Sequence, residues 1–144
     1  MTTRTVYTAD VHTVGGREGT AKSSDGQLDI KLSTPGLGRP GTNPEQLFAA
    51  GWSACFEGAL AYVAKQQGIA LPADTAVDAS VELHLDDVEG FSISAALDVT
   101  IPGIADDVAN GLIEAAHQMC PYSKMTRNGI DAVVKLGTRI SDVA

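Results

Sequence analysis

An almost entirely apolar segment near the centre of the chain, residues 47–64, constrains the fold more than any other feature. It is nearly long enough to span a bilayer, although Glu57 and two glycines interrupt it. A helix that is apolar on all sides is buried either in lipid or in protein. Because the chain is short and amphipathic strand patterns flank the segment, the sequence favours a central helix buried in protein over a membrane span.

The residues on either side of this segment mark the ends of the helix. Asn43 has the side chain of an N-cap, Pro44 suits the first helical position and Gln46 occupies the capping-box position. Gly68 is the expected stop, because glycine readily adopts the left-handed conformation that ends helices. The sequence therefore predicts one continuous helix between Pro44 and Gly68.

Strand patterns lie on both sides of the helix. Before it we expect a strand at 6–14, a glycine-rich loop at 15–19, a hairpin of residues 20–23 and 28–32 around Asp25-Gly26, and a loop at 33–43. After it, apolar and polar residues alternate in two stretches that predict an antiparallel hairpin, at 77–86 and 91–101. A second helix begins at Asp106 and ends at Cys120-Pro121, followed by a short helical turn and a closing strand at 131–139. This order predicts an α+β fold with antiparallel sheets, in a single domain that spans residues 1–144.

Composition and charge exclude several classes of function. The formal net charge is −8 and the ten basic residues are scattered, so the sequence argues against a nucleic-acid partner. The first residues show no apolar signal region, so we expect a cytoplasmic protein. The three histidines lack metal-ligand spacing, and there is no phosphate-binding glycine loop after a strand, so we expect neither a metal nor a cofactor.

The two cysteines, Cys55 and Cys120, lie 65 positions apart. A reducing cytosol would keep a purely structural pair as thiols, so a bond between them would have to cycle. Taken alone, Cys55 has the ordinary interpretation of a core residue in an apolar helix. Cys120 precedes Pro121 at the expected N-cap of a short helix, where amide donors and the helix dipole favour a thiolate.

Two charged residues have ordinary interpretations when each is taken alone. Arg17 on a glycine loop suits an exposed side chain. Glu45 in the first turn of the central helix suits the helix dipole. Neither residue by itself predicts a site.

Two runs of sequence together resemble the signatures of the organic hydroperoxide resistance (Ohr) family, within the larger Ohr/OsmC superfamily. The runs are Asn43-Pro44-Glu45-Gln46-Leu47-Phe48-Ala49-Ala50-Gly51-Trp52-Ser53-Ala54-Cys55-Phe56 and Ala116-His117-Gln118-Met119-Cys120-Pro121-Tyr122-Ser123. The order of elements, including Gly15-Gly16-Arg17, extends the resemblance over nearly the whole chain. The chain departs from the family pattern at Trp52, where tyrosine is usual, at Glu57, and at Arg127-Asn128-Gly129. The form of the second run favours the Ohr branch over the OsmC branch.

The resemblance implies a role for each of four residues. Cys55 matches the peroxidatic cysteine and Cys120 the resolving cysteine. Arg17 matches the arginine that stabilises the thiolate, and Glu45 its carboxylate partner. The resemblance also implies antiparallel sheets packed around a buried central helix in an intertwined homodimer of the Ohr/OsmC type. The implied activity is the thiol-dependent reduction of alkyl or lipid hydroperoxides, with re-reduction by a dithiol such as the lipoyl groups of a partner protein.

Physical chemistry adds two expectations to this resemblance. The dipole of the helix acts mainly within its first turn, so it cannot lower the pKa of Cys55, whereas the permanent charge of Arg17 can. A shift of about two pKa units needs about 2.7 kcal/mol of differential stabilisation, which a desolvated ion pair can supply. An apolar substrate pocket would draw on the following side chains, for which ordinary core packing is the alternative: Phe48, Trp52, Phe56, Tyr122 and Met125.

Helix arithmetic, combined with the family assignment, predicts a site shared between two chains. Glu45 and Cys55 are ten positions apart, or about 15 Å along a helix axis, which a glutamate side chain cannot span. We therefore expect each site to pair the two cysteines of one chain with Glu45, and with Arg17, of the other. Two other functions remain open: an OsmC-type peroxidase, and a non-catalytic redox sensor or binding protein that uses the same disulfide.

Overall fold

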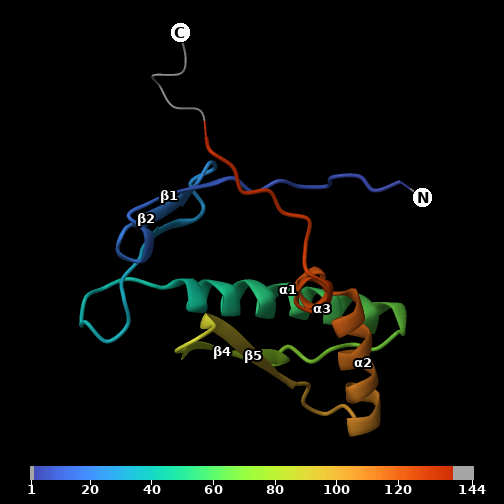
Figure 1. Cartoon of the computed structure of the whole chain (residues 1–144). Coiled ribbons are helices and arrows are strands. Elements are labelled where there is room, and N and C mark those ends of the chain that lie inside the picture. Colours follow the sequence, from blue (N-terminus) through green and yellow to red (C-terminus); the bar gives the residue numbers. More distant parts are fainter. Residues whose placement is uncertain (1, 138–144) are drawn as a thin grey trace.

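A single long helix, α1 (Pro44–Gln66), organises the computed structural model, which describes residues 2–137 (Figure 1). A hairpin of β4 (Ala76–Asp86) and β5 (Gly90–Thr100) packs along one side of it. Two helices, α2 (Asp106–Met119) and α3 (Pro121–Asn128), pack against its middle and its C-terminal half. A small sheet lies beyond its N-terminal end and is built from β1 (Val11–Val14), β2 (Thr20–Ser23) and β3 (Asp29–Lys31). These elements confirm the predicted mixture of helices and antiparallel sheets.

The predicted ends of α1 are confirmed. Asn43 has extended backbone, with φ of −147°, and its Oδ1 accepts a 2.8 Å hydrogen bond from the backbone N–H of Gln46. The side-chain oxygen of Gln46 accepts instead from the hydroxyl of Thr42, at 2.7 Å, so the capping box closes one residue earlier than expected. At the other end Gly68 takes a φ of +71°, the left-handed conformation that glycine adopts without steric cost.

Within one chain α1 is buried on one face only. The buried face packs in the core with α2 and β4 and consists of Trp52, Phe56, Ala59, Leu60, Val63 and Ala64. The opposite face is exposed and carries small residues at helical spacing: Ala50, Ala54, Gly58 and Ala61. The helix is long and apolar enough to cross a membrane by length and composition, but its buried residues form the main core of the described chain. The expectation that α1 is covered on every side is not met by this chain alone.

The β4–β5 hairpin has the predicted antiparallel pairing, from Ala76 opposite Thr100 to Asp86 opposite Gly90. Its apolar face is half-buried near the base, where Val77 and Val99 form a cross-strand pair. The same face becomes exposed toward the tip, where Phe91 is 71% exposed. The apolar face of the hairpin therefore extends beyond the part that α1 covers.

The N-terminal sheet is antiparallel in the order β1-β2-β3, and a short 3-10 turn, η1 (Gly16–Glu18), joins its first two strands. Gly19 is required after this turn because a Cβ there would collide with the backbone oxygen of Val14. The first strand is shorter than predicted and begins at Val11 instead of residue 6, since β2, its partner, ends at Ser23. The predicted hairpin between β2 and β3 is confirmed.

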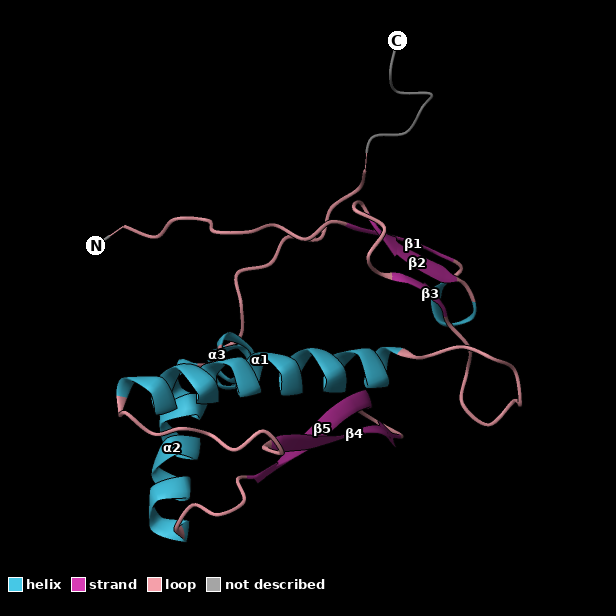
Figure 2. Cartoon of the chain, turned by 180° about the vertical axis from the view of Figure 1, so that it is seen from behind, coloured by secondary structure: helices cyan, strands magenta, loops and turns pink. Residues whose placement is uncertain are grey.

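The predicted closing strand at 131–139 is not formed over residues 131–137, and its last two residues lie outside the described part of the chain. A strand needs a neighbour to accept its backbone hydrogen bonds, and here the segment runs past the three-stranded sheet without pairing (Figure 2). Its apolar side chains are exposed, Val134 fully and Val133 by 79%. Near the other end of the chain, Val6 and Tyr7 are exposed to a similar degree. Both terminal segments thus carry apolar side chains that this chain does not cover.

The N-cap of α1 allows a direct test of the local structure. Replacing Asn43 with alanine removes the side-chain acceptor of the Gln46 N–H, so we expect the free energy of unfolding to fall by about 1 kcal/mol. Urea denaturation followed by circular dichroism measures the change, and Asn43→Asp, which keeps an acceptor, serves as the control. Equal destabilisation by both substitutions would contradict the proposed cap.

Candidate active site

The α1 helix carries two groups of functional side chains at different positions along its length. Glu45 lies in the first turn and faces Arg17 of the 3-10 turn. Cys55 lies in the middle of the helix and faces Cys120, at the junction of α2 and α3. Each group brings together two of the four residues that the sequence analysis assigned to a site.

The two cysteines form a close pair of thiols. Their sulfur atoms are 3.5 Å apart, and both thiols are free. Cys120 is fully buried and its backbone is fixed on both sides, because its N–H donates to Ala116 and its carbonyl accepts from the N–H of Lys124. A disulfide bond is about 2.05 Å long, so only a small approach separates this pair from a covalent link.

The surroundings of Cys55 favour its neutral thiol. Burial is the largest influence and raises the pKa of Cys55 above its ordinary value, and the thiol contact with Cys120 raises it further. A backbone N–H donation from Tyr122, in the first turn of α3, lowers the pKa; its influence is smaller than that of burial and larger than that of the contact with Cys120. Arg17 is not among the groups that shift this pKa in the described chain. A nearby positive charge would favour the thiolate, and no Arg or Lys of residues 2–137 is among the groups that shift this pKa.

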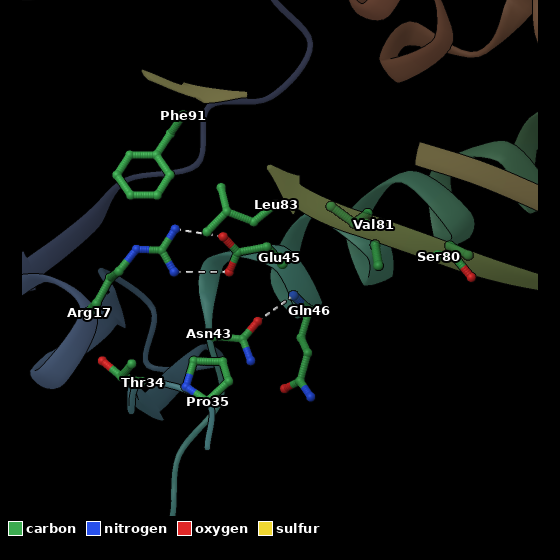
Figure 3. Close-up of a pocket in the computed structure, with 12 residues that line it drawn as sticks. Arg17, Thr34, Pro35, Asn43, Glu45, Gln46, Ser80, Val81, Leu83 and Phe91 are labelled. Carbon is green, nitrogen blue, oxygen red and sulfur yellow. Dashed lines mark hydrogen bonds and ion pairs between the residues drawn. The ribbon is translucent and has the colours of Figure 1, made fainter. Parts of the chain in front are cut away.

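Arg17 and Glu45 form a bidentate ion pair (Figure 3). The two guanidinium nitrogens of Arg17 donate to the two carboxylate oxygens of Glu45 at 3.0 and 2.6 Å. The hydrogen bond lowers the pKa of Glu45 and raises that of Arg17, so both groups stay charged. Gly15 and Gly16 adopt φ values of +83° and +59°, which lets the turn carry Arg17 toward the start of α1.

A cavity of about 670 Å³ lies beside this ion pair. Arg17 and Glu45 line one end, and apolar side chains from the tip of the hairpin, including Leu83 and Phe91, lie next to the guanidinium group (Figure 3). Leu83 and Phe91 lie in the two alternating stretches that predict the hairpin, but that pattern does not connect them with a site. The strand pattern of the sequence cannot show that these two side chains line the cavity beside Arg17, because this depends on their exposure at the tip of the hairpin.

A second ion pair supports the arginine loop. Arg39 donates to the carboxylate of Glu18 at 2.8 Å and so connects the long loop 33–43 to the turn that carries Arg17. This contact was not predicted, because the two residues are 21 positions apart and no pattern relates them.

Four of the five predicted pocket residues, all but Met125, belong to the core that contains Cys120 or pack against it, as Cys55 does. Phe48 contacts two of the others, with ring centroids 5.6 Å from Trp52 and 6.3 Å from Tyr122. Trp52 and Phe56 belong to the buried core, whereas Met125 is half-buried on α3. None of the five lines the cavity beside Arg17. Their use as a substrate pocket stays a prediction.

Sequence reasoning missed Ser123, which is fully buried on α3 and accepts a 3.1 Å hydrogen bond from the indole Nε1 of Trp52. Gly51 of α1 permits the close approach of α3, since a Cβ there would lie 2.9 Å from the hydroxyl oxygen of Tyr122. A signal was available for Ser123, because it lies in the Cys-Pro-Tyr-Ser run, but its burial could not be inferred from that run.

The two groups do not meet within the described chain. The hydrogen bonds of the Arg17 guanidinium group go to Glu45, and the hydrogen bond of the Cys55 thiol is with Cys120. Ten residues of helix separate Glu45 from Cys55, which is about 15 Å. The predicted pairs are therefore present, whereas the contact between Arg17 and Cys55 stays a prediction. Among residues 2–137, no three His, Cys, Asp or Glu side chains are grouped as metal ligands.

Comparison with known proteins identifies the family. Residues 10–135 match the family described as "OsmC-like protein". The chain is 47% identical over 137 residues to an "Organic hydroperoxide resistance protein" of Xanthomonas axonopodis pv. citri, covering 92% of this chain and 96% of that protein. It is 44% identical over 135 residues to "Organic hydroperoxide resistance protein OhrB" of Bacillus subtilis, covering 91% of this chain and 98% of that protein.

Solved structures agree with this result. The crystal structure of Bacillus subtilis OhrB matches with a TM-score of 0.80, covering 88% of this chain and 96% of that chain. An organic hydroperoxide resistance protein from Legionella pneumophila matches with a TM-score of 0.81 at 39% identity, covering 89% and 95%. The expected family is thus confirmed: this chain belongs to the OsmC-like family and, within it, to the organic hydroperoxide resistance proteins.

Proposed function

We propose that this protein is a thiol peroxidase that reduces alkyl or lipid hydroperoxides to alcohols, with Cys55 as the attacking residue and Cys120 as the resolving residue. The observation that carries the proposal is the 3.5 Å separation of the two free sulfurs, in a chain of a family whose members are named for organic hydroperoxide resistance. Cys55 is the better candidate for attack because it is partly exposed, whereas Cys120 is fully buried.

The reaction proceeds in two balanced steps. The Cys55 thiolate attacks one peroxide oxygen, the O–O bond breaks, and the leaving alkoxide takes a proton to become the alcohol. The resulting sulfenic acid then condenses with the Cys120 thiol, which forms the disulfide and releases water. A dithiol, such as the lipoyl group of a partner protein, returns the pair to thiols by thiol–disulfide exchange. The cycle needs no metal or other cofactor.

A second copy of the chain would supply the charge that Cys55 lacks. Burial raises the pKa of Cys55, and within one chain Arg17 lies with Glu45 at the start of α1. In a two-fold homodimer an antiparallel partner helix brings its own first turn beside the middle of this helix. The Arg17–Glu45 pair of one chain would then lie next to the Cys55–Cys120 pair of the other, and the guanidinium group would stabilise the thiolate.

Exposed apolar surface in three places supports the homodimer. The small-residue face of α1 allows close approach of another helix, the tip of the β4–β5 hairpin exposes Leu85 and Phe91, and both terminal segments expose apolar side chains. A two-fold arrangement that buries all three would be intertwined, since the terminal segments extend away from the rest of their own chain (Figure 1).

The apolar lining of the cavity beside Arg17 supports a preference for alkyl or lipid hydroperoxides over hydrogen peroxide. We propose a cytoplasmic location, where dithiol reductants can recycle the disulfide.

An OsmC-type peroxidase would differ in its preferred peroxide and reductant. A redox sensor would use the same disulfide without turnover.

Substitution of each cysteine tests the assignment of roles. Cys55→Ser should abolish peroxide reduction, because the attacking sulfur is lost. Cys120→Ser should still be oxidised once and should accumulate a sulfenic acid on Cys55, which dimedone labels and mass spectrometry locates. If dimedone instead labels Cys120 in the Cys55→Ser protein and that protein still consumes peroxide, the two roles are reversed.

The pH dependence of the reaction tests the role of Arg17. Removing the guanidinium group in Arg17→Ala should raise the pKa of Cys55, so the thiolate fraction at neutral pH falls and the rate of peroxide reduction drops by more than about tenfold for a shift of two units up to the free value of about 8.5. Thiolate absorbance followed against pH in the Cys120→Ser background measures the midpoint. Lys22→Ala, which removes an exposed cation that pairs with Asp29 at 4.0 Å, is the control and should leave the midpoint unchanged. Identical titration curves with and without Arg17 would remove it from the mechanism.

Mixed dimers test whether the site is shared. Cys55→Ser chains and Glu45→Ala chains, each inactive alone, should regain about half of the wild-type activity per heterodimer after joint unfolding and refolding, because one complete site is rebuilt. Heterodimers are isolated by two different affinity tags before assay. Purified heterodimers that stay inactive would contradict the shared site.

A further inference from the structure

A buried hydrogen bond lies one helical turn from the pair of cysteines and connects the same two helices. The indole N–H of Trp52 donates to the hydroxyl oxygen of Ser123 at 3.1 Å. Ser123 is fully buried and Trp52 is only 9% exposed, so water does not replace this bond if it is broken.

The sequence spacing of the four residues places the Trp52–Ser123 contact beside the Cys55–Cys120 contact. Trp52 precedes Cys55 by three residues on α1, and Ser123 follows Cys120 by three residues at the start of α3. Residues three apart lie on the same face of a helix, so both contacts join one face of α1 to the first turn of α3. The Trp52–Ser123 bond thus helps to fix where α3 begins relative to Cys55, and Cys120 is the N-cap directly before Pro121, the first residue of α3.

Cys120 packs in the core with residues of α1, but its backbone hydrogen bonds do not connect it to that helix. Its backbone bonds go to Ala116 of α2 and Lys124 of α3, so they stay within the elbow formed by these two helices, residues 106–128. Arg127 donates to the carbonyl oxygen of His117 and also stays within the elbow. Within residues 2–137, three hydrogen bonds that involve a side chain join the elbow to α1: the Trp52–Ser123 bond, the thiol contact, and the donation from the backbone N–H of Tyr122 to the Cys55 thiol. The last two both involve the sulfur of Cys55. Oxidation of Cys55 changes the thiol contact and leaves the Trp52–Ser123 bond in place.

We propose that the Trp52–Ser123 hydrogen bond is a positioning device for the resolving step: it holds the Cys120 thiol beside the oxidised Cys55 and so favours disulfide formation over further oxidation. The inference rests on the proposed peroxidase function. The sulfenic acid of Cys55 has two fates. It condenses with the Cys120 thiol to give the disulfide and water, or it reacts with a second hydroperoxide, which oxidises it to sulfinic acid and releases another alcohol. The Trp52–Ser123 bond affects only the condensation with Cys120, because it controls the position of the Cys120 thiol.

The test compares Ser123→Ala with the unmodified protein. Each protein is treated with increasing excess of tert-butyl hydroperoxide, and mass spectrometry measures the ratio of Cys55–Cys120 disulfide to Cys55 sulfinic acid. In Ser123→Ala we expect half of the Cys55 to be converted to sulfinic acid at about tenfold less peroxide than in the unmodified protein. This tenfold change in the ratio of disulfide to sulfinic acid, called the partition below, corresponds to about 1.4 kcal/mol. In the Cys120→Ser background, the rate of sulfenic acid formation at Cys55 should be the same with and without Ser123→Ala.

Three further variants separate positioning from general loosening. Trp52→Phe removes the donor and should shift the partition in the same direction, and the double variant should be no worse than the more affected single one. Ser123→Thr keeps a hydroxyl acceptor and should keep the ratio of disulfide to sulfinic acid close to that of the unmodified protein. Thr126→Val removes a hydrogen bond to the carbonyl of Ser123 on the exposed side of α3 and should leave the partition unchanged.

The possible outcomes distinguish this inference from the proposed function. If the unmodified protein forms no Cys55–Cys120 disulfide with peroxide, both are wrong. If the disulfide forms but neither Ser123→Ala nor Trp52→Phe changes the partition, only the positioning role is wrong. A shift of the same size in Thr126→Val, or a slowed first oxidation in the Cys120→Ser background, would also overturn it, since either result indicates a general disturbance of α3.

Discussion

The position of Cys55 in the middle of a buried helix is the constraint on which the rest of the structure depends. Burial raises the pKa of the thiol, and at this depth the dipole of α1 gives no compensation. The backbone N–H of Tyr122 donates to the thiol and lowers its pKa, but burial has the larger influence. The chemistry proposed for this thiol therefore requires a cation from elsewhere, and Arg17 is held ready with Glu45 about 15 Å away along the helix. The homodimer proposed above is the arrangement that brings the two together.

The fold holds the Arg17–Glu45 pair and the Cys55–Cys120 pair at two separate places along α1. The N-cap of Asn43 fixes the start of α1, and with it Glu45, while the glycines of the first loop give Arg17 the conformation that reaches it. On the other side, the junction of α2 and α3 fixes Cys120, and the indole of Trp52 holds that junction against α1. Each group contains one partner from α1 and one from a distant part of the sequence. A second copy would then only have to align two groups that are already formed.

Sequence reasoning recovered most of this arrangement where a local rule applied. The cap at Asn43, the stop at Gly68, the β4–β5 hairpin and the break at Cys120-Pro121 each follow from short-range chemistry, and the structure confirms all four. The resemblance of two motifs predicted the family, which the comparisons confirm, and together with the Gly15-Gly16-Arg17 run it suggested the four candidate site residues. The predicted closing strand is not formed, and the reason is physical. Residues 131–137 have strand composition, but a strand forms only beside a partner strand, and the described part of the chain offers none there. Ser123, Leu83 and Phe91 were missed as site residues because their importance lies in burial or exposure, which no local pattern encodes.

The central claim is that the two cysteines form a catalytic cycle, and a turnover count tests it most directly. The unmodified protein is mixed with a large excess of a dithiol such as dihydrolipoamide and with tert-butyl hydroperoxide, and the loss of peroxide is measured against a reaction without protein. The account predicts that the peroxide consumed far exceeds one equivalent per chain, because each disulfide is reduced and used again. Consumption that stops at one equivalent per chain while dithiol remains would contradict it and would indicate a protein that is oxidised once, as a sensor is.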